Sequence, residues 1–282
     1  MNNNLFFEPD GIDIDSIDIQ DSGIITVKRT RSLEAIPKKI TTIEDFEVLK
    51  HILAELRSEY DFLFRGHASK DWLLKPTLAR LEKANYSRES EVLKEFKAYC
   101  VEQGYDRFRL DLFNEDLFYM GMGRHLGLNS RLLDWSAGIC ESMAFLLEDT
   151  HLKEDGLIWI IAKPKSILFE NISPLKINDG QLHFLKEAYY LPSDLNPPLG
   201  EKRRWRQHGF FTAMAEKHIN TSLLELIKHT NIKVLSVLVP NSAKQIFKEK
   251  DLFYVTPFLL VDQDCNDIQY VNKLNSLLVK IN

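Results

Sequence analysis

Short, mostly apolar runs, too brief for helices and bounded by turn-forming or charged residues, constrain the fold of this chain most strongly. They lie at residues 62–64, 157–162 and 234–239. Their length and their aromatic and β-branched content are typical of buried strands. Between them, apolar residues recur at helical spacing over 43–56, 88–101 and 114–126. This alternation predicts an α+β fold with a mixed β-sheet core flanked by helices.

Two further stretches carry local signals. Thr42, followed by Asp45 three residues later, is typical of a helix start, so we expect a helix from residue 43. Residues 214–229 also show helical spacing and are expected to form one helix. From residue 163 to about 200 the chain contains five prolines, which predicts a long loop.

The first 40 residues differ in composition from the rest. Six acidic residues precede the first basic one, Lys28, and residues 11–20 alternate isoleucine with polar side chains. This pattern predicts an acidic N-terminal arm or a pair of edge strands at 1–40, followed by one domain at 41–282. The arm either covers a basic pocket or meets a regulatory partner protein, or it has no binding role, and the sequence does not decide between these.

Bulk composition excludes several classes of protein. The formal net charge is −5, which gives no overall basic field for nucleic acid or anionic membranes. The three cysteines are far apart, so neither a disulfide framework nor a zinc knuckle is indicated. No run approaches the ~20 apolar residues of a membrane span, and the N-terminus does not resemble a signal peptide. We therefore expect a cytoplasmic protein without a membrane partner.

The first candidate site segment ends the apolar run at 62–64. Arg65 has a planar, two-pronged donor face that suits phosphate or carboxylate, and Gly66 lets the backbone turn or approach a ligand closely. His67 follows directly. The alternative is that Arg65 pairs with a structural carboxylate such as Asp134, and residue type alone does not separate the two.

The second segment spans residues 131–136. Arg131, Asp134, Trp135 and Ser136 crowd one strand end before an apolar stretch that predicts a buried helix. Charged side chains are rarely buried without a partner, so some of these must meet each other or a ligand. Trp135 either stacks on a ligand ring or fills the core.

The third segment, at 202–212, holds the densest basic run of the chain. Arg203 lies within this run, Gln207 and His208 follow it, and aromatic residues interleave it. Such a run is usually a solvated face, but the interleaved aromatic rings make anion or nucleotide binding a rival interpretation.

Several familiar chemistries lack their motifs. The chain has no phosphate loop, no Gly-x-Gly-x-x-Gly fingerprint and no His-Glu-x-x-His zinc motif. The spacing of His67, His125 and His208 does not indicate a metal site, so no metal is expected. Ser136 with His125 and Asp134 lacks the nucleophile elbow of a hydrolase. An unrelated hydrolase or nuclease would need a metal cluster or a triad that the sequence does not supply.

Taken together, the segments follow an order known from one protein family. They are Phe64-Arg65-Gly66; Trp72, Leu73, Pro76 and Arg80; a glutamate-led helix at 91–96; His125 and Gly127; residues 131–135; residues 156–159; and Arg203, Gln207, Gly209 and Phe211. This chain resembles the FRG-domain family over residues 41–255. It carries Arg124 where the family often has Gln, and Asn129-Ser130 where Pro-Thr is usual. The resemblance implies a bacterial or phage-related setting with a toxin or defence role.

The order of motifs is also similar to that of ADP-ribosyltransferases. In that family an arginine ends an early strand, and a serine-bearing strand leads into an apolar helix, here Arg65 and Ser136 followed by residues 141–146. The resemblance implies that Arg65 holds the pyrophosphate or ribose of NAD and that Ser136 orients its strand. It also implies a catalytic glutamate where this chain has Gln207, so Asp134 or Glu141 would have to supply the carboxylate.

Two functions therefore remain open. One is an ADP-ribosyltransferase-like enzyme that uses NAD to modify protein or nucleic acid, with Arg65, Asp134, Ser136 and Gln207 as catalytic residues. Its cofactor-binding residues would be Arg65, Gly66, His67, Arg131, Trp135, Arg203 and His208. The other is a non-catalytic FRG module that binds a nucleotide, a nucleic acid or a partner protein. The enzyme requires Arg65 and Gln207 to share one cleft, and the sequence does not determine the oligomeric state.

Overall fold

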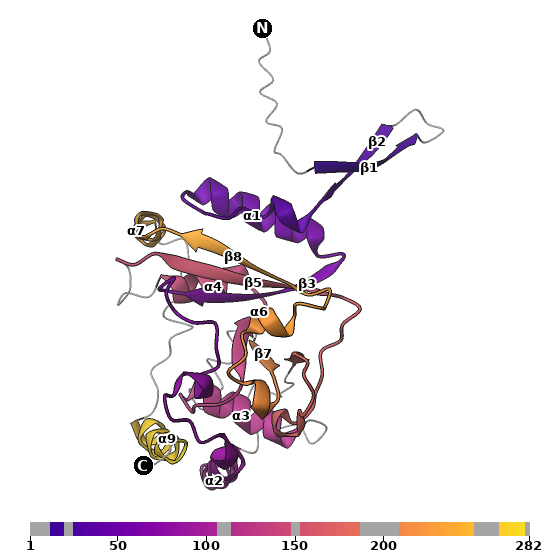
Figure 1. The fold of residues 1–282 in the computed structure, drawn as a ribbon. Coiled ribbons are helices and arrows are strands. Elements are labelled where there is room, and N and C mark those ends of the chain that lie inside the picture. Colours follow the sequence, from indigo (N-terminus) through magenta and orange to yellow (C-terminus); the bar gives the residue numbers. More distant parts are fainter. Residues whose placement is uncertain are drawn as a thin grey trace.

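A six-stranded antiparallel sheet forms the centre of the molecule (Figure 1). The computed structural model describes residues 12–19, 25–105, 114–147, 153–186, 209–250 and 265–279. The expected α+β class is confirmed. In spatial order the strands are β6 (His183–Leu185), β7 (Gly209–Ala213), β4 (Leu133–Ser136), β3 (Tyr60–His67), β5 (Gly156–Pro164) and β8 (Lys233–Val239).

Helices gather at two places around this sheet (Figure 1). α1 (Ile43–Leu56), α4 (Ile139–Leu146) and α7 (Asn241–Glu249) pack against β3, β5 and β8, whereas α2 (Glu89–Glu102), α3 (Glu115–His125) and α9 (Cys265–Leu277) form the opposite end. The helices expected at 43–56, 88–101 and 114–126 are confirmed. Within the described ranges, no helix is long and apolar enough to cross a lipid bilayer.

The start of α1 follows the sequence signal closely. The Thr42 side chain accepts a hydrogen bond from the backbone N–H of Asp45, and the Asp45 carboxylate accepts one from the backbone N–H of Thr42. This reciprocal capping box satisfies two backbone donors that a helix leaves unpaired at its N-terminus. The helix then buries Phe46, Leu49 and Ile52 against the sheet.

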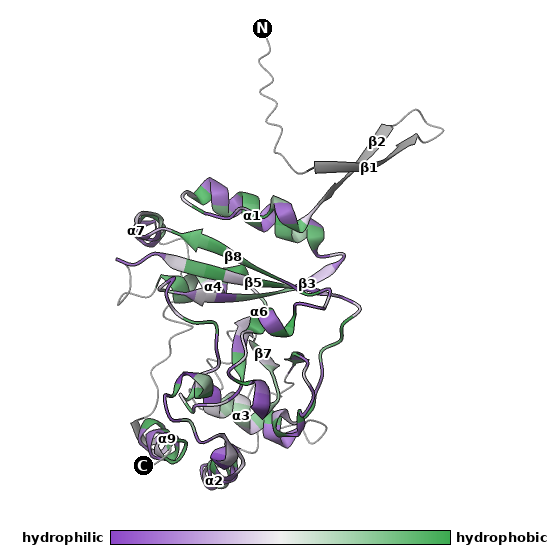
Figure 2. Ribbon diagram, viewed as in Figure 1, coloured by the Kyte–Doolittle hydropathy of each residue, from purple (hydrophilic) through white to green (hydrophobic). Residues whose placement is uncertain are grey.

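The strands β3, β5 and β8 are mostly hydrophobic (Figure 2). Their apolar side chains join two cores, one on each face of this strand group. Alternate residues of β3 point to opposite faces. Phe62 and Phe64 join the core beneath α1, α4 and α7, while Leu63 joins a second core that includes Trp135 and Phe184. Arg65 and His67 continue the row that begins with Leu63, so they lie on the face away from α1.

The sheet parts between β3 and β4. β3 pairs with β5 along its whole length, from Tyr60 to His67, whereas it pairs with β4 only at Phe64 and Ser136. Beyond this pair the two strands diverge, and side chains connect them in place of ladder hydrogen bonds. The residues that follow Phe64 are therefore positioned where the two halves of the sheet separate.

The N-terminal region divides into two parts. β1 (Ile12–Ile19) and β2 (Ile25–Arg31) form an antiparallel hairpin that makes a sheet of its own beside the end of α1 (Figure 1). Ile36 and Ile40, in contrast, are buried in the core beneath α1, and the backbone N–H of Ile40 donates to the carbonyl of Leu238. The packed domain thus includes residues that precede position 41.

The prediction of a single helix at 214–229 is wrong. The chain forms a 3₁₀ turn at Glu216–His218 and then a separate short helix, α6 (Leu223–Leu226). Ile219 packs into the core with α2, α3 and α9, whereas Leu223 and Ile227 pack into the core that contains Trp135. The break lets one segment fill two different cores. The loop expected at 163–200 contains β6, and its part from 187 on lies outside the described residues.

Candidate functional site

Arg65 bridges the point where β3 and β4 diverge. Its Nη1 donates to the backbone carbonyl of Asp134 at 2.7 Å and lies 2.9 Å from Oδ2 of the same residue. The arginine therefore does pair with Asp134, as one of the two interpretations from the sequence expected. Its side chain is 13% exposed, so the pair is largely withdrawn from solvent.

A second arginine shares the same carboxylate. Arg124, in the last turn of α3, lies with Nε 3.1 Å and Nη2 3.0 Å from Oδ1 of Asp134. Gly127 adopts φ +95° and ends the helix, so that the chain turns back toward β4. Burial alone would raise the pKa of Asp134, but Arg124 and Arg65 hold it well below its ordinary value.

A third arginine completes the group. Arg80 ends a 3₁₀ turn at Leu78–Arg80, and its guanidinium donates to the carbonyls of Lys75 and Leu73 at 3.0 and 3.2 Å. Partial desolvation, together with the positive charges of Arg65 and Arg124, lowers the pKa of Arg80. Three guanidinium groups thus lie within electrostatic range of one another and of one carboxylate. We call Arg65, Arg80, Arg124, Asp134 and His67 the arginine cluster.

His67 adds no charge to this cluster. It is 1% exposed, and burial, with Arg65 and Arg80 nearby, lowers its pKa to about 3. Arg65 Nε lies 3.1 Å from one ring nitrogen and Trp159 Nε1 lies 3.3 Å from the other. A neutral imidazole offers one acceptor nitrogen, so only one of these contacts is a full hydrogen bond in a given tautomer. The cluster therefore carries three positive charges against one negative charge.

The shift of His67 predicts a pH-dependent stability. Its folded pKa of about 3 lies below the ordinary 6.5, so the unfolded state binds the extra proton in that interval. The stabilisation is present above pH ~6.5 and is lost as the pH falls, by about 1.4 kcal/mol at pH ~5.5. We expect the stability difference between the wild type and His67→Gln, from urea unfolding, to shrink by this amount between pH ~7.5 and ~5.5. Other titrating groups cancel in this difference, and a constant difference would contradict the assignment.

Two indole rings lie beside the arginines. Trp159 is the β5 partner of Arg65 in the ladder, and Trp72 lies with its ring centre 5.9 Å from that of His67. Trp72 is 37% exposed and Trp159 is half-buried. Partly exposed indoles offer flat apolar faces on which a planar ring can stack.

The arginines retain donors for a ligand. Among the described residues, no partner reaches Nη2 of Arg65 or Nη1 of Arg124. A guanidinium fork with a free edge binds phosphate or carboxylate oxygens through charge-assisted hydrogen bonds. Excess positive charge, free donors and stackable rings together form a candidate site for an anion that carries an aromatic group.

The structure separates Arg131 from this cluster. Its Nε donates to Glu89 Oε2 at 2.6 Å and its backbone N–H donates to Glu89 Oε1 at 3.0 Å. Both residues are 3% exposed. Arg131 precedes β4 and turns toward α2, whereas Asp134 lies within the strand, so adjacency in sequence did not place them at one site.

The other predicted residues of β3 and β4 have packing neighbours. Trp135 is 2% exposed and donates from Nε1 to Thr212 Oγ1 at 2.9 Å, so its indole presents no face on which a ligand could stack. Ser136 is 6% exposed at the end of β4, opposite Phe64 and Gly209. Gly66 lies against the backbone of α4, and the carbonyl of Ser142 would be 1.9 Å from a Cβ added there.

Most of the third predicted segment, residues 202–208, lies outside the described residues, and the rest belongs to β7. Arg203, Gln207 and His208 fall within 187–208, outside the described residues, so their convergence with Arg65 stays a prediction. His125 is buried beside Phe211. Within the described ranges, no three His, Cys, Asp or Glu side chains are grouped so that they could hold a metal ion.

The sequence patterns did not identify Arg80, Arg124, Trp72 and Trp159 as site residues. For Arg124 the sequence did contain a signal, because this arginine stands where the FRG family often has Gln. Arg80 and Trp72 belong to the family pattern but were not assigned to a site. Their positions depend on how α3 and the 3₁₀ turn pack beside the strands.

The fold and the cluster define an α+β domain with an arginine-rich candidate site where β3 and β4 separate. The family model of the FRG domain matches residues 60–155, which hold all five residues of the arginine cluster. The chain thus contains an FRG domain. No curated protein and no solved structure matches the chain.

Proposed function

We propose that this FRG domain binds a phosphate-bearing nucleotide, with NAD as the first candidate, at the arginine cluster. The observation that carries the proposal is the charge balance. Arg65 and Arg124 share Asp134, Arg80 adds a third positive charge nearby, and His67 stays neutral, so two positive charges remain uncompensated at this site. A pyrophosphate supplies matching negative charge and enough oxygens for the free guanidinium edges.

The neighbouring rings support a nucleotide over a simple anion. Trp72 and Trp159 flank His67, and Trp159 lies beside Arg65 in the sheet. A ligand whose phosphates met the arginines could place a base or a nicotinamide ring on an indole face. NAD carries both rings and a pyrophosphate, and the motif order that resembles ADP-ribosyltransferases points to the same ligand.

ADP-ribosyl transfer is the second candidate. Arg65 and Ser136 lie on neighbouring strands, and α4 follows Ser136, as that resemblance implies. In the reaction the glycosidic C–N bond breaks, its electron pair leaves with nicotinamide, and an acceptor lone pair forms the new bond. A carboxylate must stabilise the developing positive charge on the ribose. Asp134 is already neutralised by two arginines, so this step needs negative charge from a further residue, and binding is the better supported function.

Calorimetric titration with NAD, ADP-ribose and pyrophosphate tests the proposal. We expect Arg65→Gln and Arg124→Gln to weaken all three by about 10- to 100-fold, because each removes a charge-assisted hydrogen bond. Arg80 donates to two backbone carbonyls and makes no ion pair among the described residues, so Arg80→Gln tests the charge of the site without breaking an ion pair. The matched control is Arg57→Gln, an exposed arginine at the end of α1, beyond the opposite face of the sheet. Affinities that fall equally in the control, or no binding of any ligand at millimolar concentration, would overturn the proposal.

A nicotinamide-release assay separates the two functions. Release by the wild type that disappears in Asp134→Asn, with NAD still bound, would assign the catalytic carboxylate to Asp134. Asp134→Asn should itself tighten pyrophosphate binding several-fold, because it removes the one negative charge of the arginine cluster. NAD binding without release in the wild type would leave the domain a binding module.

A further inference from the structure

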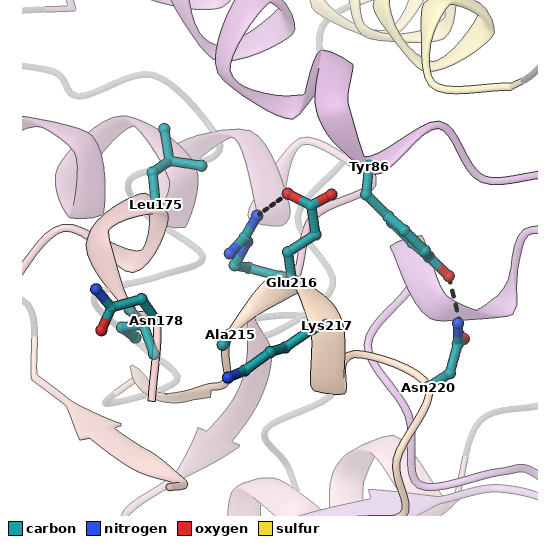
Figure 3. A pocket seen from close by; sticks show the side chains of 9 residues that line it. Tyr86, Leu175, Asn178, Ala215, Glu216, Lys217 and Asn220 are labelled. Atoms are coloured by element: carbon teal, nitrogen blue, oxygen red, sulfur yellow. Dashed lines mark hydrogen bonds and ion pairs between the residues drawn. The ribbon is translucent and has the colours of Figure 1, made fainter. Parts of the chain in front are cut away.

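A hollow in the surface lies apart from the arginine cluster. It has a volume of about 520 Å³ and opens between the 3₁₀ turn at Tyr86–Arg88, the turn at Pro174–Lys176 and the segment that carries Glu216 and Asn220 (Figure 3). Pockets that bind small molecules have volumes of this order. None of its lining residues belongs to the arginine cluster.

Arg131 provides a buried donor in this pocket. Glu89 occupies its Nε, and its Nη1 lies 3.4 Å from the carbonyl of Pro174. Its Nη2 faces Glu216, whose Oε2 lies 3.9 Å away, the ion pair marked by a dashed line in Figure 3. That separation is beyond hydrogen-bond distance, so the donors of Nη2 are not saturated. A guanidinium that is 3% exposed and held by Glu89 is a rigid anchor for an oxygen anion.

The carboxylate of Glu216 lies beside the Arg131 guanidinium. The Glu216 side chain is 51% exposed and lies at the rim, next to Lys217. Among the lining residues, Arg131 and Lys217 carry positive charge and Glu216 carries negative charge. The pocket is therefore strongly polarised, with a buried cation and an exposed carboxylate 3.9 Å apart.

The remaining walls are apolar or amide. Leu175 and Ile177 continue the core with α2 and α3 to the pocket surface. The Tyr86 hydroxyl donates to Oδ1 of Asn220 at 3.1 Å, which fixes the phenol ring as part of the wall (Figure 3). Such a surface suits a large apolar or aromatic side chain.

We propose that this pocket binds a free α-amino acid with a large apolar or aromatic side chain. An α-amino acid carries a carboxylate and an ammonium on one carbon, at a spacing that matches Arg131 Nη2 and Glu216 Oε2. The carboxylate pairs with Arg131, the ammonium pairs with Glu216, and the side chain packs on Leu175 and Tyr86. A phosphate or another dianion would meet the carboxylate of Glu216 beside Arg131, so it fits this pocket less well than a zwitterion does.

Calorimetric titration with L-phenylalanine, N-acetyl-L-phenylalanine and L-phenylalaninamide on the full chain tests the proposal. The N-acetyl compound lacks the ammonium and the amide lacks the carboxylate, so the ligands are varied while Arg131 and the fold stay intact. We expect phenylalanine to bind and each analogue to bind at least about tenfold more weakly, because each loses one charge-assisted contact. Equal affinity of either analogue, or no binding of phenylalanine at millimolar concentration, would overturn the proposal.

Substitutions of exposed glutamates test the same proposal by changing the protein and not the ligand. Glu216→Gln should weaken phenylalanine about tenfold and leave N-acetylphenylalanine no weaker, because that ligand has no ammonium to lose. The matched control is Glu225→Gln, a carboxylate whose side chain is 63% exposed and pairs with Lys228. Arg65→Gln should leave phenylalanine binding unchanged. A loss in Glu225→Gln equal to that in Glu216→Gln would show that the effect is not local to the pocket.

Discussion

Glu89→Gln should lower the free energy of unfolding by about 3–5 kcal/mol. Glu89 and Arg131 are each 3% exposed, and the carboxylate binds both Nε and the backbone N–H of Arg131. Burial raises the pKa of Glu89 and the Arg131 guanidinium opposes that shift, while the 2.6 Å contact with Nε supports the paired, ionised form. The substitution keeps the shape of the side chain but replaces this carboxylate, so a buried guanidinium loses its closest counterion. Urea unfolding monitored by circular dichroism measures the loss.

The same helix offers a matched control. Glu91, two residues further along α2, pairs with Arg88 at 2.7 Å, but its side chain is 51% exposed. Glu91→Gln should therefore cost between ~0 and ~1 kcal/mol, because solvent screens surface ion pairs. Replacing both buried partners, as Glu89→Leu with Arg131→Met, should recover most of the loss. Equal effects at positions 89 and 91 would contradict a buried ion pair.

Gly66→Ala should destabilise the protein by about 3 kcal/mol, at the upper end of the cost of overpacking. A Cβ at this position would lie 1.9 Å from the carbonyl oxygen of Ser142 and 3.1 Å from the backbone nitrogen of Leu146. Both atoms belong to the backbone of α4, so no change of rotamer relieves the contact and the helix has to move away from β3. Arg65 and His67 flank Gly66, so we also expect weaker nucleotide binding.

Gly180→Ala is the control for Gly66→Ala. There the added Cβ would meet only Nε2 of His218, at 3.5 Å, an ordinary contact. This variant should stay within about 0.5 kcal/mol of the wild type. Thermal unfolding of both variants under one condition makes the comparison, and a stable Gly66→Ala would show that α4 does not pack as closely as described. Gly66 thus allows the close approach of α4 to β3.

Local signals in the sequence determined much of the secondary structure. Thr42 and Asp45 start α1 with a capping box, and helical spacing places α2 and α3. Apolar runs mark β3, β5 and β8. These features depend on interactions within a few residues, such as backbone capping and the choice of one apolar face. The FRG motifs likewise identified the domain that the family comparison confirms.

The structure of the segment at 214–229 is not determined by its own residues alone. Its residues have helical spacing, yet Ile219 and Leu223 are buried in different cores. Their spacing is compatible with one helix, but a single helix would present both to one neighbourhood. The positions of two separate cores depend on the whole sheet and are not encoded within this segment.

The sequence by itself therefore determined the α+β class and most element positions, and it offered the Arg65–Asp134 pair as one of two alternatives. Only the tertiary structure decided which charges share a site. Arg124 reaches Asp134 because the turn at Gly127 folds the end of α3 back on β4, while Arg131, only three residues from Asp134, is buried against Glu89. Side-chain direction follows strand register and helix packing, and the cost of an unpaired buried charge selects partners from across the fold.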